Sequence, residues 1–232
     1  TGAGGFLGAN LVGGLVARGA GVAAVVRTGR GLQADSDGVT VVHADVTDRA
    51  SLDAVFASVR PTHVVHAAIT PGHPDAPEAR ARQLEVSVNG TWNVLDAAVT
   101  HGAERVVHVG SSLEYGHRVE PLHEELALEP VTFRGAAKAA ATVIALHAAR
   151  AGAPVVVVRP FSVYGPHEPP HRLVPTAIRA ALDDGALPLT EPGLRRDFVH
   201  VDDVVRAIVA ALTARPVVHG RVYNAGTGVQ TA

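Results

Sequence analysis

Short apolar runs rich in valine recur along the chain and are continuous rather than alternating with polar residues. Such runs occupy 22–26, 63–67, 105–109 and 155–158, and segments with helical spacing lie between them, including a long one at about 80–100. A strand that is apolar on both faces is buried on both faces, as in a parallel sheet covered by helices. The sequence therefore predicts an α/β fold, a doubly wound parallel sheet of the Rossmann type.

The regular alternation stops after Pro160. Residues 164–170 are rich in Pro and His, and helical spacing returns at 173–182 and 204–212. We expect a Rossmann domain over 1–160, and over 161–232 mixed segments that form a smaller lobe interleaved with the end of the sheet. Because the chain opens on a glycine-rich turn and stops at Gly228-Val229-Gln230-Thr231-Ala232, we also expect a first strand and a C-terminal part to be missing from it.

The charge balance and residue content exclude several kinds of partner. Twenty Lys and Arg against 22 Asp and Glu give a net charge of −2, which argues against nucleic-acid binding. No apolar run reaches membrane-spanning length, and the absence of Cys fits a reducing compartment. The 13 His residues form no compact cluster with carboxylates. We therefore expect a cytoplasmic protein without a membrane, nucleic-acid or metal partner.

The first motif is the opening sequence TGAGGFLG. Its glycines allow a tight turn, close approach of the backbone to a pyrophosphate, and close packing of the following helix, whose first N–H groups face the phosphates. A glycine-rich loop without a ligand is the alternative. The pattern predicts a dinucleotide site, with an adenine pocket just after a further strand expected at 40–43. The predicted site residues are Gly2, Gly5, Phe6, Leu7, Gly8, Asp45 and Val46.

The choice of cofactor depends on the residue that follows the strand expected at 22–26. Proteins that prefer NAD place a carboxylate there for the ribose hydroxyls, but this chain reads Val25-Val26-Arg27-Thr28-Gly29-Arg30. Arg27, with Arg30 as a second cation, can pair with the 2′-phosphate of NADP. We expect NADP, with NAD as the alternative; a solvated Arg27 without a ligand is the simpler interpretation of that residue.

Four segments together resemble the extended short-chain dehydrogenase/reductase superfamily over essentially the whole chain. They are TGxxGFxG, His66-Ala67-Ala68, Val109-Gly110-Ser111-Ser112 and the sequence RPFSVYGP at 159–166. The sequence RRDFVHVDDV at 195–204 is similar to the nucleotide-sugar epimerase/dehydratase/ketoreductase branch.

The resemblance implies partners and further site residues. In that branch an arginine matching Arg196 binds the pyrophosphate of a nucleotide-diphosphate sugar. Members of the branch also often form homodimers through two helices, which here would be the helix that carries Lys138 and the helix that precedes it. The resemblance adds cofactor contacts from Ala67, Ala68, Lys138, Pro160 and Phe161, and substrate contacts from Ser112, Tyr164 and Arg196.

The catalytic positions depart from the family pattern. The superfamily pairs a Ser or Thr with Tyr-x-x-x-Lys, and Ser111 and Lys138 match, but the tyrosine position is Arg134. A guanidinium stays protonated, so it polarises a carbonyl but does not cycle as acid and base near neutral pH. Proton transfer then falls to Ser111, a water, or one of three nearby side chains: Tyr164, Glu114 and His117. A second departure is Ser87, where the family usually has Asn.

The function that the resemblance implies is NADP-dependent chemistry at C4 of a nucleotide-activated sugar. Reduction of a 4-keto group is the leading hypothesis. A 4-epimerase and a non-catalytic dinucleotide-binding or regulatory protein on the same fold are the alternatives. A 4,6-dehydratase fits less well, because Ser112-Leu113 stands where dehydratases have an Asp-Glu pair.

Overall fold

A computed structural model describes residues 1–27, 37–72, 76–187, 195–215 and 218–231. The central sheet is parallel and has the order β3-β4-β5-β8. Strands β1 and β2 form a second parallel pair. Residues 1–3 link this pair to the central sheet, because Ala67 N donates a hydrogen bond to Thr1 O and Ala3 N donates one to Val25 O. These strands are β1 Val22–Val26, β2 Val39–His43, β3 His63–His66, β4 Arg105–Val109, β5 Val155–Pro160 and β8 Val222–Ala225.

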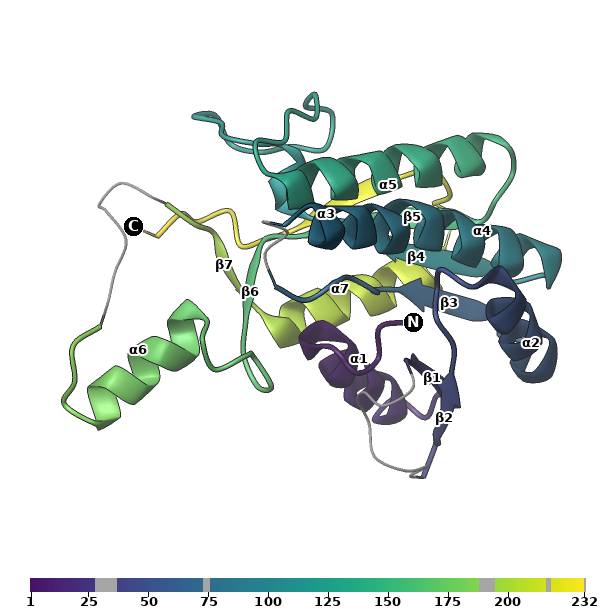
Figure 1. The fold of residues 1–232 in the computed structure, drawn as a ribbon, viewed down its shortest axis with the longest axis horizontal. Helices are drawn as coiled ribbons and strands as arrows, with labels where there is room; N and C mark the ends of the chain where they lie inside the picture. The colour runs from purple at the N-terminus through teal and green to yellow at the C-terminus, as the bar shows by residue number, and fades with distance from the viewer. Residues whose placement is uncertain (28–36, 73–75, 188–194, 216–217, 232) are drawn as a thin grey trace.

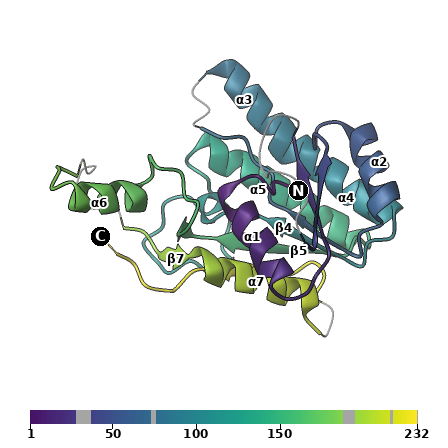
Figure 2. The same ribbon diagram turned by 90° about the horizontal axis from the view of Figure 1, so that it is seen from below.

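Helices cover both faces of the sheet (Figures 1 and 2). On β4, Val106 packs into one core, with side chains from α2, α4 and α5, whereas Val107 packs into the other, with side chains from α1 and α7. Adjacent valines of the strand are therefore buried on opposite faces of the sheet, which explains why the apolar runs in the sequence are continuous. The arrangement confirms the predicted doubly wound fold. The helices are α1 Phe6–Val16, α2 Arg49–Val59, α4 Gly90–Thr100, α5 Phe133–Arg150 and α7 Val201–Thr213.

The long helical pattern near 80–100 contains a π-helical turn. The segment comprises α3 Pro77–Leu84, the turn Glu85–Asn89 and α4. Ser87 is buried within the turn, where its Oγ accepts a hydrogen bond from Gln83 Nε2 at 2.7 Å. A Cβ at Gly90 would lie 2.7 Å from Val46 Cγ2, so this helix approaches the segment that follows β2 as closely as glycine permits.

After Pro160 the chain first forms the elements of the lobe and then returns to the central sheet as β8. Two short strands, β6 Ser162–Tyr164 and β7 Phe198–His200, pair in parallel, and α6 Leu173–Leu182 stands apart from the body (Figure 1). Strands β6, β7 and β8 lie outside the apolar runs from which we predicted strands. Within the described residues, no helix combines the length and apolar character that crossing a bilayer requires.

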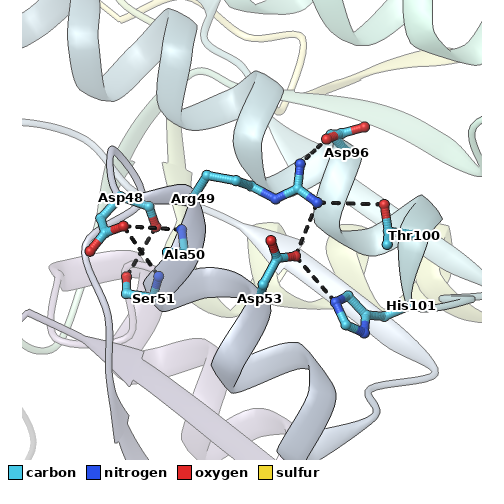
Figure 3. Close-up of polar contacts among 8 residues, drawn as sticks. All are labelled: Asp48, Arg49, Ala50, Ser51, Asp53, Asp96, Thr100 and His101. Atoms are coloured by element: carbon cyan, nitrogen blue, oxygen red, sulfur yellow. Dashed lines mark hydrogen bonds and ion pairs between the residues drawn. The ribbon is translucent and has the colours of Figure 1, made fainter.

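A polar cluster attaches α2 to α4 (Figure 3). The side chain of Asp48 accepts hydrogen bonds from the backbone N–H groups of residues 50 and 51 and so caps α2. Arg49 pairs with Asp53 at 3.0 Å and also with Asp96 on α4, while His101 Nε2 lies 3.2 Å from Asp53 Oδ1. Because these charged groups are partly exposed, their ion pairs contribute little to the stability of the fold. We expect them mainly to fix the orientation of α2 relative to α4.

Candidate functional site

The opening glycines form a tight cradle between strands and helix. Gly2 has φ of 76°, and a Cβ there would lie 2.7 Å from the carbonyl carbon of Ala67. A Cβ at Gly8 would overlap the carbonyl oxygen of Gly2 and lie 2.8 Å from Ala3 Cα. Gly5 precedes α1, and no side chain caps the helix. Its first N–H groups are therefore available to an anion, as phosphate binding requires.

A cavity of about 540 Å³ lies over this cradle, at the carboxyl ends of the strands. Its volume is in the range of small-molecule and cofactor sites. The cradle and the uncapped helix fit a dinucleotide. Of the predicted residues, the cavity wall contains Gly2, Gly5, Phe6, Arg27, Asp45, Val46, Ala67, Ala68 and Arg134. Its wall does not include Leu7, Gly8, Ser111, Ser112, Lys138, Pro160, Phe161, Tyr164 or Arg196.

Asp45 is held as an acceptor at one end of the cavity. It accepts hydrogen bonds from Thr47 N at 2.9 Å and Thr47 Oγ1 at 2.8 Å, and it pairs with Arg82 Nη2 at 2.6 Å. Burial raises the pKa of Asp45, but the hydrogen bonds from Thr47 and Arg82 outweigh it and keep the pKa below its ordinary value. Arg82, on α3, was not predicted from the sequence.

Arg27 lies exposed at the end of β1 and lines the cavity. The described residue at the strand end is therefore an arginine and not a carboxylate. The second cation considered for the same role, Arg30, lies outside the described residues.

Ser111 and Lys138 both lie at the carboxyl end of β4. Lys138 is buried on α5 and its Nζ donates to Val109 O at 2.7 Å. Ser111 follows and caps a short 3₁₀ turn, its Oγ accepting from Leu113 N at 3.2 Å. A Cβ at Gly135 would lie 2.5 Å from Leu113 O, so α5 packs directly on this turn. Arg134, one helical turn before Lys138, is half-buried and reaches the cavity.

The environment of Lys138 brings its titration close to neutral pH. Burial lowers the pKa of Lys138 from 10.5 to about 8; Glu114 opposes this, and Arg134 adds to it. A lysine in this range can both hold and release a proton under mild conditions, unlike the arginine beside it.

Lys138 is expected to make stability depend on pH under alkaline conditions. With a pKa of about 8 folded and 10.5 unfolded, the unfolded chain binds the extra proton between these values, so the free energy of unfolding rises as pH increases from 8 to 10.5. The rise from this group is roughly 3 kcal/mol. Urea unfolding across this window, with wild type and Lys138→Met compared, measures it. Parallel pH profiles for the two proteins would contradict the expectation.

A fully buried ion pair supports the loop that carries Ser111. Glu114 Oε2 accepts from Arg159 Nε at 2.8 Å, with side-chain exposures of 0% and 2%. Glu114 Oε1 accepts from Ser111 N at 2.8 Å and Thr142 Oγ1 at 3.1 Å, and Arg159 Nη1 donates to Tyr115 OH at 2.8 Å. Burial raises the pKa of Glu114, while Arg159 opposes this. Both carboxylate oxygens are engaged and neither lines the cavity, so Glu114 supports the loop and does not face the ligand.

The remaining predicted residues lie on the smaller lobe. Tyr164 packs edge-to-face on Phe198 and His200, with ring centroids 6.5 and 5.3 Å away. Arg196 is exposed and forms a backbone bridge with Thr231. In the described parts of the chain, no three His, Cys, Asp or Glu side chains lie together in a way that could hold a metal ion. The lobe also lines the cavity through four residues that were not predicted as site residues: His167, Pro169, His171 and Arg172.

Comparison with known proteins matches this architecture to one family. A model of the NAD dependent epimerase/dehydratase family matches residues 1–226. The chain is 33% identical over 202 residues to dTDP-glucose 4,6-dehydratase of Streptomyces antibioticus, an alignment that covers 84% of this chain and 58% of that protein. The chain thus spans less than two thirds of the length of this relative.

Solved structures of related epimerases have a fold similar to that of this chain. UDP-glucose 4-epimerase of Thermotoga maritima with UDP-glucose is 25% identical with a TM-score of 0.89, over 99% of this chain and 76% of that one. UDP-glucose 4-epimerase of Thermus thermophilus in complex with NAD is 28% identical with a TM-score of 0.85, over 99% and 77%. The glycine cradle, the parallel sheet and these matches together place the chain in the NAD dependent epimerase/dehydratase family.

Proposed function

We propose that this chain carries out NADP-dependent chemistry at C4 of a nucleotide-activated sugar, by reduction of a 4-keto group. The observation that carries the proposal is the cavity that starts at the glycine cradle and ends at Arg134, one helical turn from Lys138. Bound in its reduced form, NADPH would supply the hydride. Residues 1–160 hold the cofactor and residues 161–232 complete the substrate side.

The chain's own residues position the reacting group and handle the proton. Arg134 lines the cavity and polarises the substrate oxygen as a permanent cation. Lys138, with its pKa lowered to about 8, holds the proton that the missing tyrosine would supply, and Ser111 orients the oxygen at the end of β4. Neither Ser111 nor Lys138 lines the cavity, and the lysine already donates to Val109 O, so both side chains must move to reach a substrate and we expect slow turnover.

Dehydration is less well supported than reduction. The two residues after Ser111 are Ser112 and the exposed Leu113, neither of which is a carboxylate. The next residue, Glu114, is fully buried against Arg159. A 4,6-dehydratase needs acid and base groups beside the sugar, and this turn presents none, although one of the relatives described above is a dehydratase.

NADPH is expected to bind tighter than NADH. Arg27 is exposed on the cavity wall, where it can reach the 2′-phosphate. A charge-assisted contact contributes about 1.5 to 3 kcal/mol, which is roughly one to two decades in affinity. Calorimetric titration of wild type and Arg27→Ala with both cofactors measures the difference. Equal affinities in the wild type, or a preference for NADH that survives Arg27→Ala, would remove the argument for NADP and leave NAD, which the related epimerase structure contains.

The substrate contacts and the assembly are part of the same proposal. Arg196 binds the nucleotide diphosphate, and Tyr164 and Ser112 contact the sugar. The helices α4 and α5 form a homodimer face, supported by the exposed apolar side chains of Trp92, Val99 and Val143. The absence of Cys favours a cytoplasmic location.

Two alternatives use the same site. A 4-epimerase would pass through a transient ketone, and the two epimerases among the related structures favour it. A non-catalytic dinucleotide-binding protein would keep the cradle without turnover, and the arginine at position 134 favours it.

Arg134→Tyr tests the enzymatic proposal. The variant restores Tyr-x-x-x-Lys and is expected to raise the rate of NADPH oxidation by neutral nucleotide 4-ketosugars about tenfold, because general acid catalysis is worth ~100-fold or more when fully developed. Oxidation of NADPH is followed by absorbance, with Lys138→Met as the inactive control. A lower rate in Arg134→Tyr would assign Arg134 a positive role in reduction. No turnover in either protein, with NADPH bound to both, would favour the non-catalytic alternative.

A further inference from the structure

Arg134 is a half-buried cation without a compensating charge among the residues that the structure describes. Its Nε is buried and has no hydrogen-bond partner, and its Nη2 donates only a long bond of 3.4 Å to Thr70 O. Burial and the neighbouring Arg172 both lower the pKa of Arg134, and no carboxylate opposes them. A guanidinium removed from water without a counterion is unfavourable, so a ligand that supplies negative charge here would be strongly stabilised.

The cavity wall around Arg134 is positively charged. Arg172 lies on the rim with its side chain 45% exposed, and its ion pair with Glu168 uses Nε at 3.1 Å. His167 and His171 also line the cavity. Among the described residues of the wall, the one carboxylate is Asp45, and it is already paired with Arg82. The described wall therefore offers Arg134 no carboxylate partner, and its neighbour Arg172 adds a second guanidinium, whose Nε is paired with Glu168.

We propose that Arg134, with Arg172, binds a carboxylate carried by the sugar, so that the substrate is a nucleotide-activated acidic sugar, such as a hexuronate, rather than a neutral hexose. This inference rests on the proposed function. Arg134 precedes Lys138 by one helical turn, which places the guanidinium at the reacting end of the substrate. Its planar fork suits the two oxygens of a carboxylate.

The other anionic groups of the complex have sites elsewhere. The phosphates of the dinucleotide lie at the start of α1 in the proposed arrangement, where no side chain caps the helix. The diphosphate of the sugar nucleotide is assigned to Arg196, on the lobe and outside the cavity wall. The charge that Arg134 requires is therefore left to the sugar.

Three ligands that differ in one group at a time test the proposal. The whole chain, saturated with NADPH, is titrated by calorimetry with UDP, UDP-glucose and UDP-glucuronate. UDP-glucuronate is expected to bind at least tenfold tighter than UDP-glucose, because a charged hydrogen-bonded pair contributes about 1.5 to 3 kcal/mol. In Arg134→Gln this preference is expected to disappear because the affinity for UDP-glucuronate falls, while the affinities for UDP and NADPH stay within twofold of wild type.

Two further variants isolate the cause. Arg134→Lys keeps the charge but loses the fork, so we expect an intermediate preference; it also decides the test if Arg134→Gln does not fold, as judged by the thermal unfolding midpoint. Arg80→Gln is the matched control, because Arg80 is a nearby arginine whose guanidinium lies 5.7 Å over the ring of Phe133 and outside the cavity wall. It is expected to keep the full preference for UDP-glucuronate.

The outcomes separate this inference from the function beneath it. Equal binding of UDP-glucose and UDP-glucuronate by the wild type, or a preference that survives in both Arg134 variants, overturns the carboxylate site and leaves the nucleotide-sugar proposal standing. A loss of NADPH affinity in Arg134→Gln assigns the charge to the cofactor and also overturns it. Failure of all three ligands, UDP included, contradicts the proposed function itself.

Discussion

Gly8→Ala is expected to lower the affinity for NADPH at least 100-fold and to destabilise the fold. The added Cβ would overlap the carbonyl oxygen of Gly2 and lie 2.8 Å from Ala3 Cα. These neighbours are backbone atoms, so relief requires α1 to move away from the turn that would hold the phosphates. A 100-fold loss corresponds to about 2.7 kcal/mol of binding, and overpacking of this kind costs about 1 to 3 kcal/mol of stability.

Gly13→Ala provides the matched control for that substitution. Gly13 lies in the same helix, but a Cβ there would meet nothing within 4 Å. Alanine is expected to leave NADPH binding unchanged and to increase stability by up to ~1 kcal/mol, since glycine is a poor residue inside a helix. Calorimetry and urea unfolding on the two variants give the comparison. If Gly8→Ala binds NADPH within threefold of wild type, the close approach at the cradle is not needed for binding.

Arg159→Met is expected to destabilise the protein by about 3 to 5 kcal/mol. It leaves Glu114 fully buried, facing Thr142 and the backbone of Ser111 without its cation. The double variant Glu114→Leu with Arg159→Met is expected to lose less than Arg159→Met alone, because it removes both buried charges together. Urea unfolding measures all of these free energies.

The exposed pair Arg206–Asp203 supplies the control for burial. Its side chains are 65% and 43% exposed. Arg206→Met is therefore expected to change the free energy of unfolding by less than about 1 kcal/mol. Similar losses from Arg159→Met and Arg206→Met would mean that the buried pair adds nothing beyond what a surface pair does.

The strands that could be predicted were those with apolar side chains on both faces. Val106 and Val107 serve opposite cores, and that double burial is visible as a run of valines. Strand β8, Val222–Ala225, contains a half-exposed Tyr223 and an Asn that contacts Tyr115, so its pattern is not apolar, and only pairing with β5 identifies it.

The glycine cradle was predictable because close backbone packing and positive φ require glycine, and the structure places Gly2 at positive φ and Gly8 against the backbone of Gly2. The wall residues Arg172 and His171 were not predictable, because they come from the lobe and reach the cavity only through tertiary packing. The pairing of Arg159 with Glu114 is also long-range. The signal available in the sequence was a charged residue directly after four buried valines, a position that a lone arginine rarely occupies.

The pairing of β5 with β8 has a consequence for how the chain folds. Val157 pairs with Val222, and the whole of β6, α6, β7 and α7 lies between them in the sequence. The lobe is therefore a loop closed at both ends by one sheet, and contacts of such high sequence separation form late and slowly. During synthesis, the fourth strand of the central sheet is added only after the lobe has emerged from the ribosome. A chimaera that takes its lobe from a relative must accordingly preserve two junctions with the sheet, one after β5 and one before β8.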